Sequence, residues 1–250
     1  ADLRGFTAVS EAFKDNPEAL TSMVNAILTP LTNIVHSHQG TVDKYMGDCI
    51  MAFWNAPLDV ENHADQAVNA AIQMVDAMPG INTALLREFG HDGFRLGIGV
   101  NSGKVIVGNM GSESRFDYSV LGDAVNLAAR LEGQSKTYGV EIIVGNDCFV
   151  QIKDKELKLL PIDELLVKGK AEPVKVYTPV RNATKADLEA HAQAMNAYQR
   201  GEIEQAKHEL LAMKDRFSGQ LNGIYALLLK RREDAKLENK SQWRGIWVPK

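Results

Sequence analysis

Two opposite charges flank a glycine in the segment 44–48, which reads Lys44-Tyr45-Met46-Gly47-Asp48. Strand-forming residues surround this segment, so we predict a β-hairpin with Met46-Gly47 as a two-residue loop. In that register Tyr45 pairs with Asp48, and Lys44 and Asp48 leave the hairpin on opposite faces. The hairpin would then carry an ammonium and a carboxylate into two different pockets. A solvated turn is the alternative.

A second carboxylate, Asp2, precedes the segment Gly5-Phe6-Thr7, where a helical pattern begins. Backbone amides at a helix start attract anions, so this segment suits a phosphate group. Asp2 and Asp48 carry hard oxygen ligands that suit Mg²⁺ or Mn²⁺ bound to phosphate oxygens. A capped helix start is the alternative. We expect Asp2 to end a strand whose earlier residues precede this chain.

A third candidate lies in the predicted helix 124–134, where Asn126 and Arg130 are four residues apart and therefore share one face. An amide and a guanidinium one turn apart can hold a phosphate or a developing oxyanion. An exposed polar face is the alternative. Farther along, the segment 168–170 places two lysines around a glycine, which suits a phosphate tail, although a solvated loop also explains it.

Together these motifs resemble the catalytic domain of the class III nucleotide cyclases, the adenylyl and guanylyl cyclase homology family. The resemblance covers residues 1 to about 180 and keeps the family's motif order and approximate spacing. It is carried by Asp-Leu-Arg-Gly-Phe-Thr (2–7), Asp-Lys-Tyr-Met-Gly-Asp (43–48), Leu-Gly-Asp-Ala-Val-Asn-Leu-Ala-Ala-Arg-Leu (121–131) and Val-Lys-Gly-Lys (167–170).

The resemblance implies an adenylyl cyclase that converts ATP to 3′,5′-cyclic AMP and pyrophosphate with two divalent metal ions, Mg²⁺ or Mn²⁺. It implies metal ligands at Asp2, the Leu3 backbone carbonyl and Asp48. It implies that Asn126 and Arg130 stabilise the transition state and that Lys44 and Ser119 recognise the purine. It implies that Lys170, Phe6 and Thr7 bind the phosphates. It further implies a homodimer in which one chain gives the metal ligands and its partner gives Lys44, Ser119, Asn126, Arg130 and Lys170.

Ser119 departs from the commonest pattern, because this second purine-reading position is often aspartate in adenylyl cyclases. A hydroxyl can still accept a hydrogen bond from the adenine amino group, so ATP remains the expected substrate. Serine or threonine there resembles the subclass that responds to bicarbonate, which makes bicarbonate a candidate effector. A guanylyl cyclase and a catalytically silent nucleotide-binding regulator remain alternatives. A diguanylate-type transferase would need a Gly-Gly-Asp/Glu-Glu-Phe hairpin, which 44–49 lacks.

Composition narrows the class of protein. A net charge of −4 and a pI near 5.9 argue against nucleic-acid binding. Cys49 and Cys148 lie in apolar runs, which predicts buried thiols in a reducing, cytoplasmic setting. No run of 18 apolar residues occurs, so we expect a fragment that does not span a membrane. The full-length protein can still be membrane-anchored and carry an upstream sensor domain that is missing here.

The expected architecture is α+β, with a ferredoxin-like cyclase core of helices on a largely antiparallel sheet. The catalytic domain is predicted over 1–181, with a truncated first strand, and a helical tail over 182–250. Predicted core elements are a helix over 62–78 that ends at Pro79-Gly80 and strands over 94–100, 105–108, 140–144 and 174–180. Predicted tail helices cover 187–200, 202–217 and 219–238, with a break at Gly201, a tetratricopeptide-like pattern, and Trp243 and Trp247 docking the terminus.

Overall fold

The computed structural model describes residues 1–166, 172–237 and 246–247. Its strands are β1 (Asp2–Arg4), β2 (Thr41–Met46), β3 (Cys49–Phe53), β4 (Arg95–Val100), β5 (Ile106–Ser112), β6 (Arg115–Leu121), β7 (Ile142–Gly145), β8 (Leu159–Leu165), β9 (Val174–Pro179) and β10 (Ile246–Trp247). Its α-helices are α1 (Phe6–Ala12), α2 (Pro17–Ser37), α3 (His63–Phe89), α4 (Asp123–Tyr138), α5 (Asn146–Phe149), α6 (Lys185–Arg200), α7 (Ile203–Ala212) and α8 (Asn222–Leu237).

The central sheet has the strand order β1-β4-β7-β9-β8-β10. Three of its strand pairs are antiparallel (β1 with β4, β7 with β9, β8 with β9) and two are parallel. The β2–β3 hairpin adjoins β1 on the side away from β4, because Ile50 and Ala1 exchange backbone hydrogen bonds of 2.8 and 2.9 Å. The α+β prediction is confirmed.

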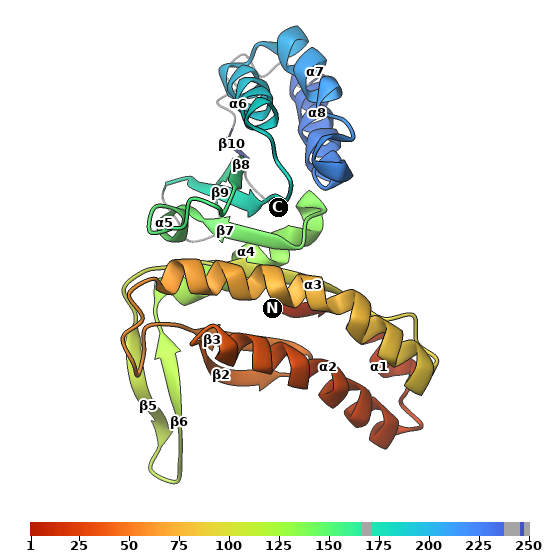
Figure 1. Cartoon of the computed structure of the whole chain (residues 1–250), viewed down its shortest axis with the longest axis vertical. Helices are drawn as coiled ribbons and strands as arrows, with labels where there is room; N and C mark the ends of the chain where they lie inside the picture. Colours follow the sequence, from red (N-terminus) through yellow and green to blue (C-terminus); the bar gives the residue numbers. More distant parts are fainter. Residues whose placement is uncertain (167–171, 238–245, 248–250) are drawn as a thin grey trace.

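Two hydrophobic cores lie on the two faces of this sheet. Alternate residues of β7 divide between them, as the strand period of two requires: Ile142 and Val144 join the core under α2 and α3, and Ile143 joins the core of α4 and the tail. Figure 1 shows α2 and α3 running side by side, the tail helices beyond β8 and β9, and the β5–β6 hairpin projecting from the body.

Helix α3 corrects one prediction. It does not end at Pro79-Gly80 but continues to Phe89, and it ends where Gly90 adopts a left-handed conformation with φ of 68°. Met78 before the proline and Leu85 after it are both buried in the first core. Their burial outweighs the lost backbone hydrogen bond and the low helix propensity, so tertiary packing overrides the local signal.

The β2–β3 hairpin corrects a second prediction. Met46 pairs with Cys49 and Tyr45 with Ile50, so the two-residue loop is Gly47-Asp48 and not Met46-Gly47. Gly47 has φ of 64°, and a glycine at the first loop position adopts this value without a steric penalty. The predicted register required that conformation of Met46. The ladder also contains a bulge between Val42 and Lys44, which shifts the register at Asp43.

The tail packs against the preceding part of the chain in a shared core. Buried Ala194, Tyr198 and Leu228 of the tail belong to the same cluster as Leu131 of α4 and Ile162 of β8. The predicted boundary between 181 and 182 stays a prediction, and it does not separate two independent cores.

The tail's helix limits partly match the predictions. Gly201, with φ of 82°, ends α6 as predicted, whereas α7 ends at Ala212, before the predicted 217. Trp243 lies outside the described residues, and Trp247 lies in β10, which pairs with β8 in parallel. Both cysteines are free thiols, as predicted, with Cys148 buried and Cys49 partly buried.

Candidate functional site

The fold brings Asp2 and Asp48 together. Asp2 is the first residue of β1 and does not end a strand as predicted, and Asp48 lies at the tip of the adjoining hairpin. Partial burial, followed by the charge of Asp2, raises the pKa of Asp48, while the backbone N–H groups of Asp48 and Leu3 oppose this by donating hydrogen bonds to its carboxylate. Two like charges held close together favour an added cation.

A third carboxylate near this pair, Glu132 of α4, was missed in the sequence. Burial, followed by the charge of Asp2, raises the pKa of Glu132. Gly97, which pairs with Asp2 across the sheet, leaves room for it, because a Cβ on Gly97 would lie 2.6 Å from Glu132 Oε1. Arg4 fixes α4 beneath β1 by donating a hydrogen bond of 2.9 Å to Ser135 Oγ and another to the Val140 carbonyl. No spacing in the sequence relates Glu132 to Asp2.

Oxygen donors of the acidic pair fit a hard divalent cation. In the part of the chain that the structure describes, no three or more His, Cys, Asp or Glu side chains are grouped so as to hold a metal ion. This chain would therefore supply the Asp2 and Asp48 carboxylates together with a main-chain oxygen such as that of Leu3, and water or phosphate oxygens would complete the coordination.

A separate polar group forms around Lys44 and Ser119, which are far apart in sequence. Asp43 joins them: its Oδ1 lies 3.2 Å from Lys44 Nζ, and its Oδ2 accepts a hydrogen bond of 2.8 Å from Ser119 Oγ. The backbone N–H of Val120 donates to the same Oδ2 at 3.1 Å. Nearby, the rings of Phe53 and Tyr118 lie 6.1 Å apart and pack β3 against β6. Sequence reasoning missed Asp43, because a residue beside Lys44 in a regular strand would face away from it.

The two polar groups have different neighbours. No hydrogen bond or ion pair within residues 1–166, 172–237 and 246–247 joins the Asp2–Asp48 pair to the Lys44–Ser119 pair. The charges of Lys44 and Asp48 thus enter different environments, although the predicted hairpin register that led to this expectation was wrong.

Asn126 and Arg130 lie on α4, one turn apart, as predicted. Asn126 is exposed and Arg130 is partly exposed. Neither side chain makes a hydrogen bond or an ion pair with any other described residue. Both groups are therefore open to a ligand from outside this chain's own fold.

The remaining predicted phosphate contacts are Phe6, Thr7 and Lys170. Helix α1 begins at Phe6, directly after β1, and no side chain caps its first amides. Thr7 is exposed on its first turn. Lys170 lies outside the described residues.

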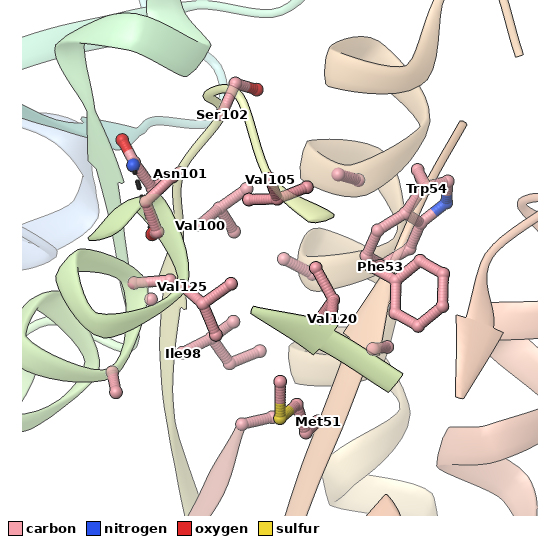
Figure 2. Close-up of a pocket in the computed structure, with 18 of the residues that line it drawn as sticks. Met51, Phe53, Trp54, Ile98, Val100, Asn101, Ser102, Val105, Val120 and Val125 are labelled. Carbon is pink, nitrogen blue, oxygen red and sulfur yellow. Dashed lines mark hydrogen bonds between the residues drawn. The ribbon is translucent and has the colours of Figure 1, made fainter. Parts of the chain in front are cut away.

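A cavity of about 700 Å³ lies between β3 and β4 and reaches α3 and α4 (Figure 2). Its labelled walls are mostly apolar, with Met51 and Phe53 facing Ile98 and Val125, and with Asn101 at its upper end donating to the Ala124 carbonyl at 3.2 Å. This lining suits apolar groups and not a triphosphate. Asp2, Asp48 and Ser119 do not line it, although their chain neighbours Ala1, Cys49 and Val120 do.

None of the described helices combines the length and the apolarity that a membrane span requires.

Comparisons with known proteins agree on one family. The model of the adenylate and guanylate cyclase catalytic domain matches residues 1–179. Adenylate cyclase 1 of Rhizobium meliloti is 32% identical over 179 residues, which cover 72% of this chain and 26% of that protein. Adenylate cyclase of Anabaena cylindrica is 35% identical over 181 residues, which cover 70% of this chain and 35% of that protein. The chain thus spans about a third or less of the length of these relatives.

Solved structures give the same answer. The adenylyl cyclase CyaB from P. aeruginosa has a TM-score of 0.65 at 32% identity, covering 73% of this chain and 91% of that one. The guanylyl cyclase Cya2 has a TM-score of 0.63 at 32% identity, covering 75% and 92%. The matched region contains the acidic pair, the Lys44–Asp43–Ser119 group and the exposed face of α4. This chain therefore belongs to the class III nucleotide cyclases, the family of adenylate and guanylate cyclase catalytic domains.

Proposed function

We propose that this chain is the catalytic fragment of an adenylyl cyclase that converts ATP to 3′,5′-cyclic AMP and pyrophosphate. The observation that carries the choice of ATP is the Lys44–Asp43–Ser119 group. The Lys44 ammonium has only donors, which suits the N1 acceptor of adenine and opposes the protonated N1 of guanine. Adenylate cyclases among the similar proteins support the same choice.

Metal binding is proposed at Asp2, Asp48 and the Leu3 backbone carbonyl. Support comes from the like-charged pair itself, in which burial, followed by the charge of Asp2, raises the pKa of Asp48. When bound, two divalent ions, Mg²⁺ or Mn²⁺, supply the acidification of the ribose 3′-hydroxyl and the neutralisation of the triphosphate.

Arg130 and Asn126 are proposed to act on the reacting groups. In the reaction the 3′-oxygen gives its proton to water or to a phosphate oxygen of the substrate and bonds to the α-phosphorus, and the bond from that phosphorus to the pyrophosphate oxygen breaks. Arg130 would stabilise the negative charge that develops on the α-phosphoryl oxygens, and Asn126 would orient the ribose. Phe6, Thr7 and Lys170 are proposed contacts of the phosphate chain.

A homodimer with shared sites is the proposed assembly. The β5–β6 hairpin projects from the body, and its Ile106, Phe116 and Leu121 are 72, 63 and 60% exposed. Large apolar side chains gathered on one projecting element favour a covering partner. We infer that a second copy covers them and that Asn126 and Arg130 act on the nucleotide held by the partner's acidic pair.

The wider context is also part of the proposal. An upstream sensor is proposed because the relatives are longer than the matched region. A cytoplasmic location is proposed from the free thiols. Bicarbonate is proposed as an effector on the basis of Ser119, and equal rates in bicarbonate and chloride, at matched pH and ionic strength, would exclude it.

Purified protein with Mn²⁺ and either ATP or GTP tests the central proposal. We expect cyclic AMP from ATP at the higher kcat/KM, and an at least tenfold loss of ATP use in Lys44→Glu, about 1.4 kcal/mol of transition-state stabilisation. A preference for GTP would make the chain a guanylyl cyclase, like the similar Cya2. Nucleotide binding without a cyclic product would make it a silent regulator.

A further inference from the structure

Asp43 is the buried centre of the group that is proposed to read the base. Its side chain has no exposed surface, whereas the Lys44 side chain is 40% exposed. Ser119 is 5% exposed. A carboxylate so fully removed from water needs partners for both of its oxygens. The Ser119 hydroxyl and the Val120 N–H donate hydrogen bonds to Oδ2, whereas Oδ1 makes an ion pair with Lys44 at 3.2 Å and accepts no hydrogen bond from a described residue.

The bulge in β2 explains why Asp43 can reach these partners. In a regular strand Asp43 and Lys44 would point to opposite faces. The register shift between Val42 and Lys44 breaks this alternation, and a bulge of this kind redirects a side chain. Asp43 can therefore contact both Lys44 beside it and Ser119 on β6.

The hydrogen bond to Asp43 fixes what Ser119 can offer a ligand. A hydroxyl has one proton and two lone pairs, and a carboxylate can only accept. Because Ser119 donates its proton to Asp43 Oδ2, its oxygen can only accept from the base. The other carboxylate oxygen holds the Lys44 ammonium, which can only donate. Asp43 thus arranges one acceptor and one donor side by side.

We propose that Asp43 is a positioning residue for base selectivity, which orients Ser119 to accept from the 6-amino group of adenine and Lys44 to donate to N1. This inference rests on the proposed function, since it concerns how that site selects ATP. Serine stands at the second purine-reading position of this pocket, and Asp43 supplies a carboxylate beside it. Each oxygen of Asp43 has a separate role, so each role can be removed separately.

Two ATP analogues test the two roles. Purine riboside 5′-triphosphate lacks the 6-amino group, and 1-deaza-ATP lacks the N1 acceptor. For each protein we would measure kcat/KM for ATP relative to each analogue. In the unaltered protein, both ratios should be about ten, as expected for the loss of one hydrogen bond. Ser119→Ala should lower the ratio of ATP to purine riboside 5′-triphosphate to about one. Lys44→Ala should lower the ratio of ATP to 1-deaza-ATP to about one.

Variants of Asp43 then separate its two oxygens. Asp43→Ala removes both, so both ratios should fall to about one. Asp43→Asn keeps one oxygen, which the buried Val120 N–H retains together with the Ser119 hydroxyl, and it turns an amide N–H₂ toward Lys44. Only the 1-deaza-ATP ratio should then fall. The Asp43→Ala/Ser119→Ala double variant should equal Asp43→Ala, because both changes remove one interaction.

Asp92→Asn is the matched control, because Asp92 is exposed between α3 and β4, and it should keep both ratios. Thermal melting and dimer content establish that each variant is folded. If Asp43→Ala does not fold, Asp43→Asn decides alone, and an unchanged 1-deaza-ATP ratio overturns the inference. If Ser119→Ala and Lys44→Ala behave as expected while the Asp43 variants keep both ratios, only the role of Asp43 falls. If the unaltered protein discriminates against neither analogue, the base-reading assignment falls with it.

Discussion

Among single residues, Asp48 has the environment that leads to the most direct prediction. It lies beside Asp2, and burial together with that neighbouring charge raises its pKa. The folded state therefore disfavours the ionised Asp48 at neutral pH, and this penalty disappears as the pH falls through its raised pKa toward the unfolded value. A divalent cation would remove the same penalty at constant pH.

Asp48→Asn should abolish cyclase activity without unfolding the protein, because it removes a metal ligand and a repulsive charge together. We expect less than about a tenth of the original turnover, since a lost ligand costs several kcal/mol of transition-state stabilisation. Mn²⁺ should raise the melting temperature of the unaltered protein and leave that of Asp48→Asn unchanged. Asp92→Asn serves as the control, and activity above a tenth in Asp48→Asn would contradict the metal assignment.

Single residues also show where sequence reasoning stops. The types and spacing of Asn126 and Arg130 predict a common helix face, and α4 confirms it. Asp43 could not be found, because its role depends on a bulge that no local pattern signals. Glu132 was missed since its proximity to Asp2 depends on how α4 crosses the sheet.

At the scale of elements, three side chains fasten the tail to the catalytic part. Arg231 of α8 donates to Asp163 of β8 and, at 3.2 Å, to the Tyr138 hydroxyl at the end of α4. Tyr138 also donates to Asp163. Arg231 and Asp163 have side chains that are 2 and 1% exposed. Burial raises the pKa of Tyr138, so its hydroxyl stays protonated and remains a donor.

Arg231→Met should lower the free energy of unfolding by about 3–5 kcal/mol, because it leaves the Asp163 charge buried without its partner. Urea denaturation measures this change. The Arg231→Met/Asp163→Asn double variant should recover at least half of the loss, since no buried charge remains. Arg95→Met breaks an ion pair with Glu141 in which the Arg95 side chain is 63% exposed, and it should cost no more than about 1 kcal/mol. Equal losses of unfolding free energy in Arg231→Met and Arg95→Met would contradict the stabilising role of the buried Arg231–Asp163 pair.

His191 of α6 makes the tail sensitive to acid. Its Nε2 donates to the Pro161 carbonyl at 2.7 Å, and its Nδ1 therefore accepts from the Tyr225 hydroxyl at 2.9 Å. Burial lowers the pKa of His191. The folded state then binds fewer protons than the unfolded state, so stability present at neutral pH is lost as the pH falls below the ordinary value of 6.5.

Between pH 7.5 and 5.5 the unaltered protein should lose up to about 1.4 kcal/mol more free energy of unfolding than His191→Gln. Urea denaturation at the two pH values measures the difference. His208→Gln, at an exposed position on α7, is the matched control and should behave like the unaltered protein. The same pH dependence in His191→Gln would show that other groups cause it.

Elements were predictable where the local signal and the packing agree. Gly201 ends α6 because the chain adopts a left-handed conformation at this position, which favours glycine. Pro79-Gly80 gave the wrong end for α3, because buried residues on both sides keep the helix continuous. The hairpin loop was displaced by one residue, since strand propensity around 41–53 does not distinguish between adjacent registers.

For the whole molecule, the proposed sharing of sites between two chains has a quantitative test. Asp48→Asn and Arg130→Ala should each be inactive alone, because each damages both sites of its homodimer. In a mixed dimer one site receives both lesions and the other receives none. Random exchange gives about half mixed dimers, each with one intact site of two, so mixing should restore about a quarter of the unaltered activity per total protein.

Subunit exchange must be shown in the mixture, for example by two different tags. The control mixes Asp48→Asn with Lys44→Glu and Asp48→Asn with Asp2→Asn. The first pair should complement, since its two lesions come from different contributing chains, and the second should not. No recovery in an exchanging mixture of Asp48→Asn and Arg130→Ala would mean that each chain carries a complete site.

The core shared by the tail and the sheet has a practical consequence for how this protein is cut. The family match ends at residue 179, but the sheet beside it carries Ile162 and Leu165 on a face that the tail helices cover. A protein truncated at the family boundary would present that face to water and to its neighbours, and the Asp163 carboxylate within it would lack its Arg231 partner. Recombinant fragments that stop near 181 should therefore be prone to aggregation, and those that retain α8 should be the ones that remain in solution.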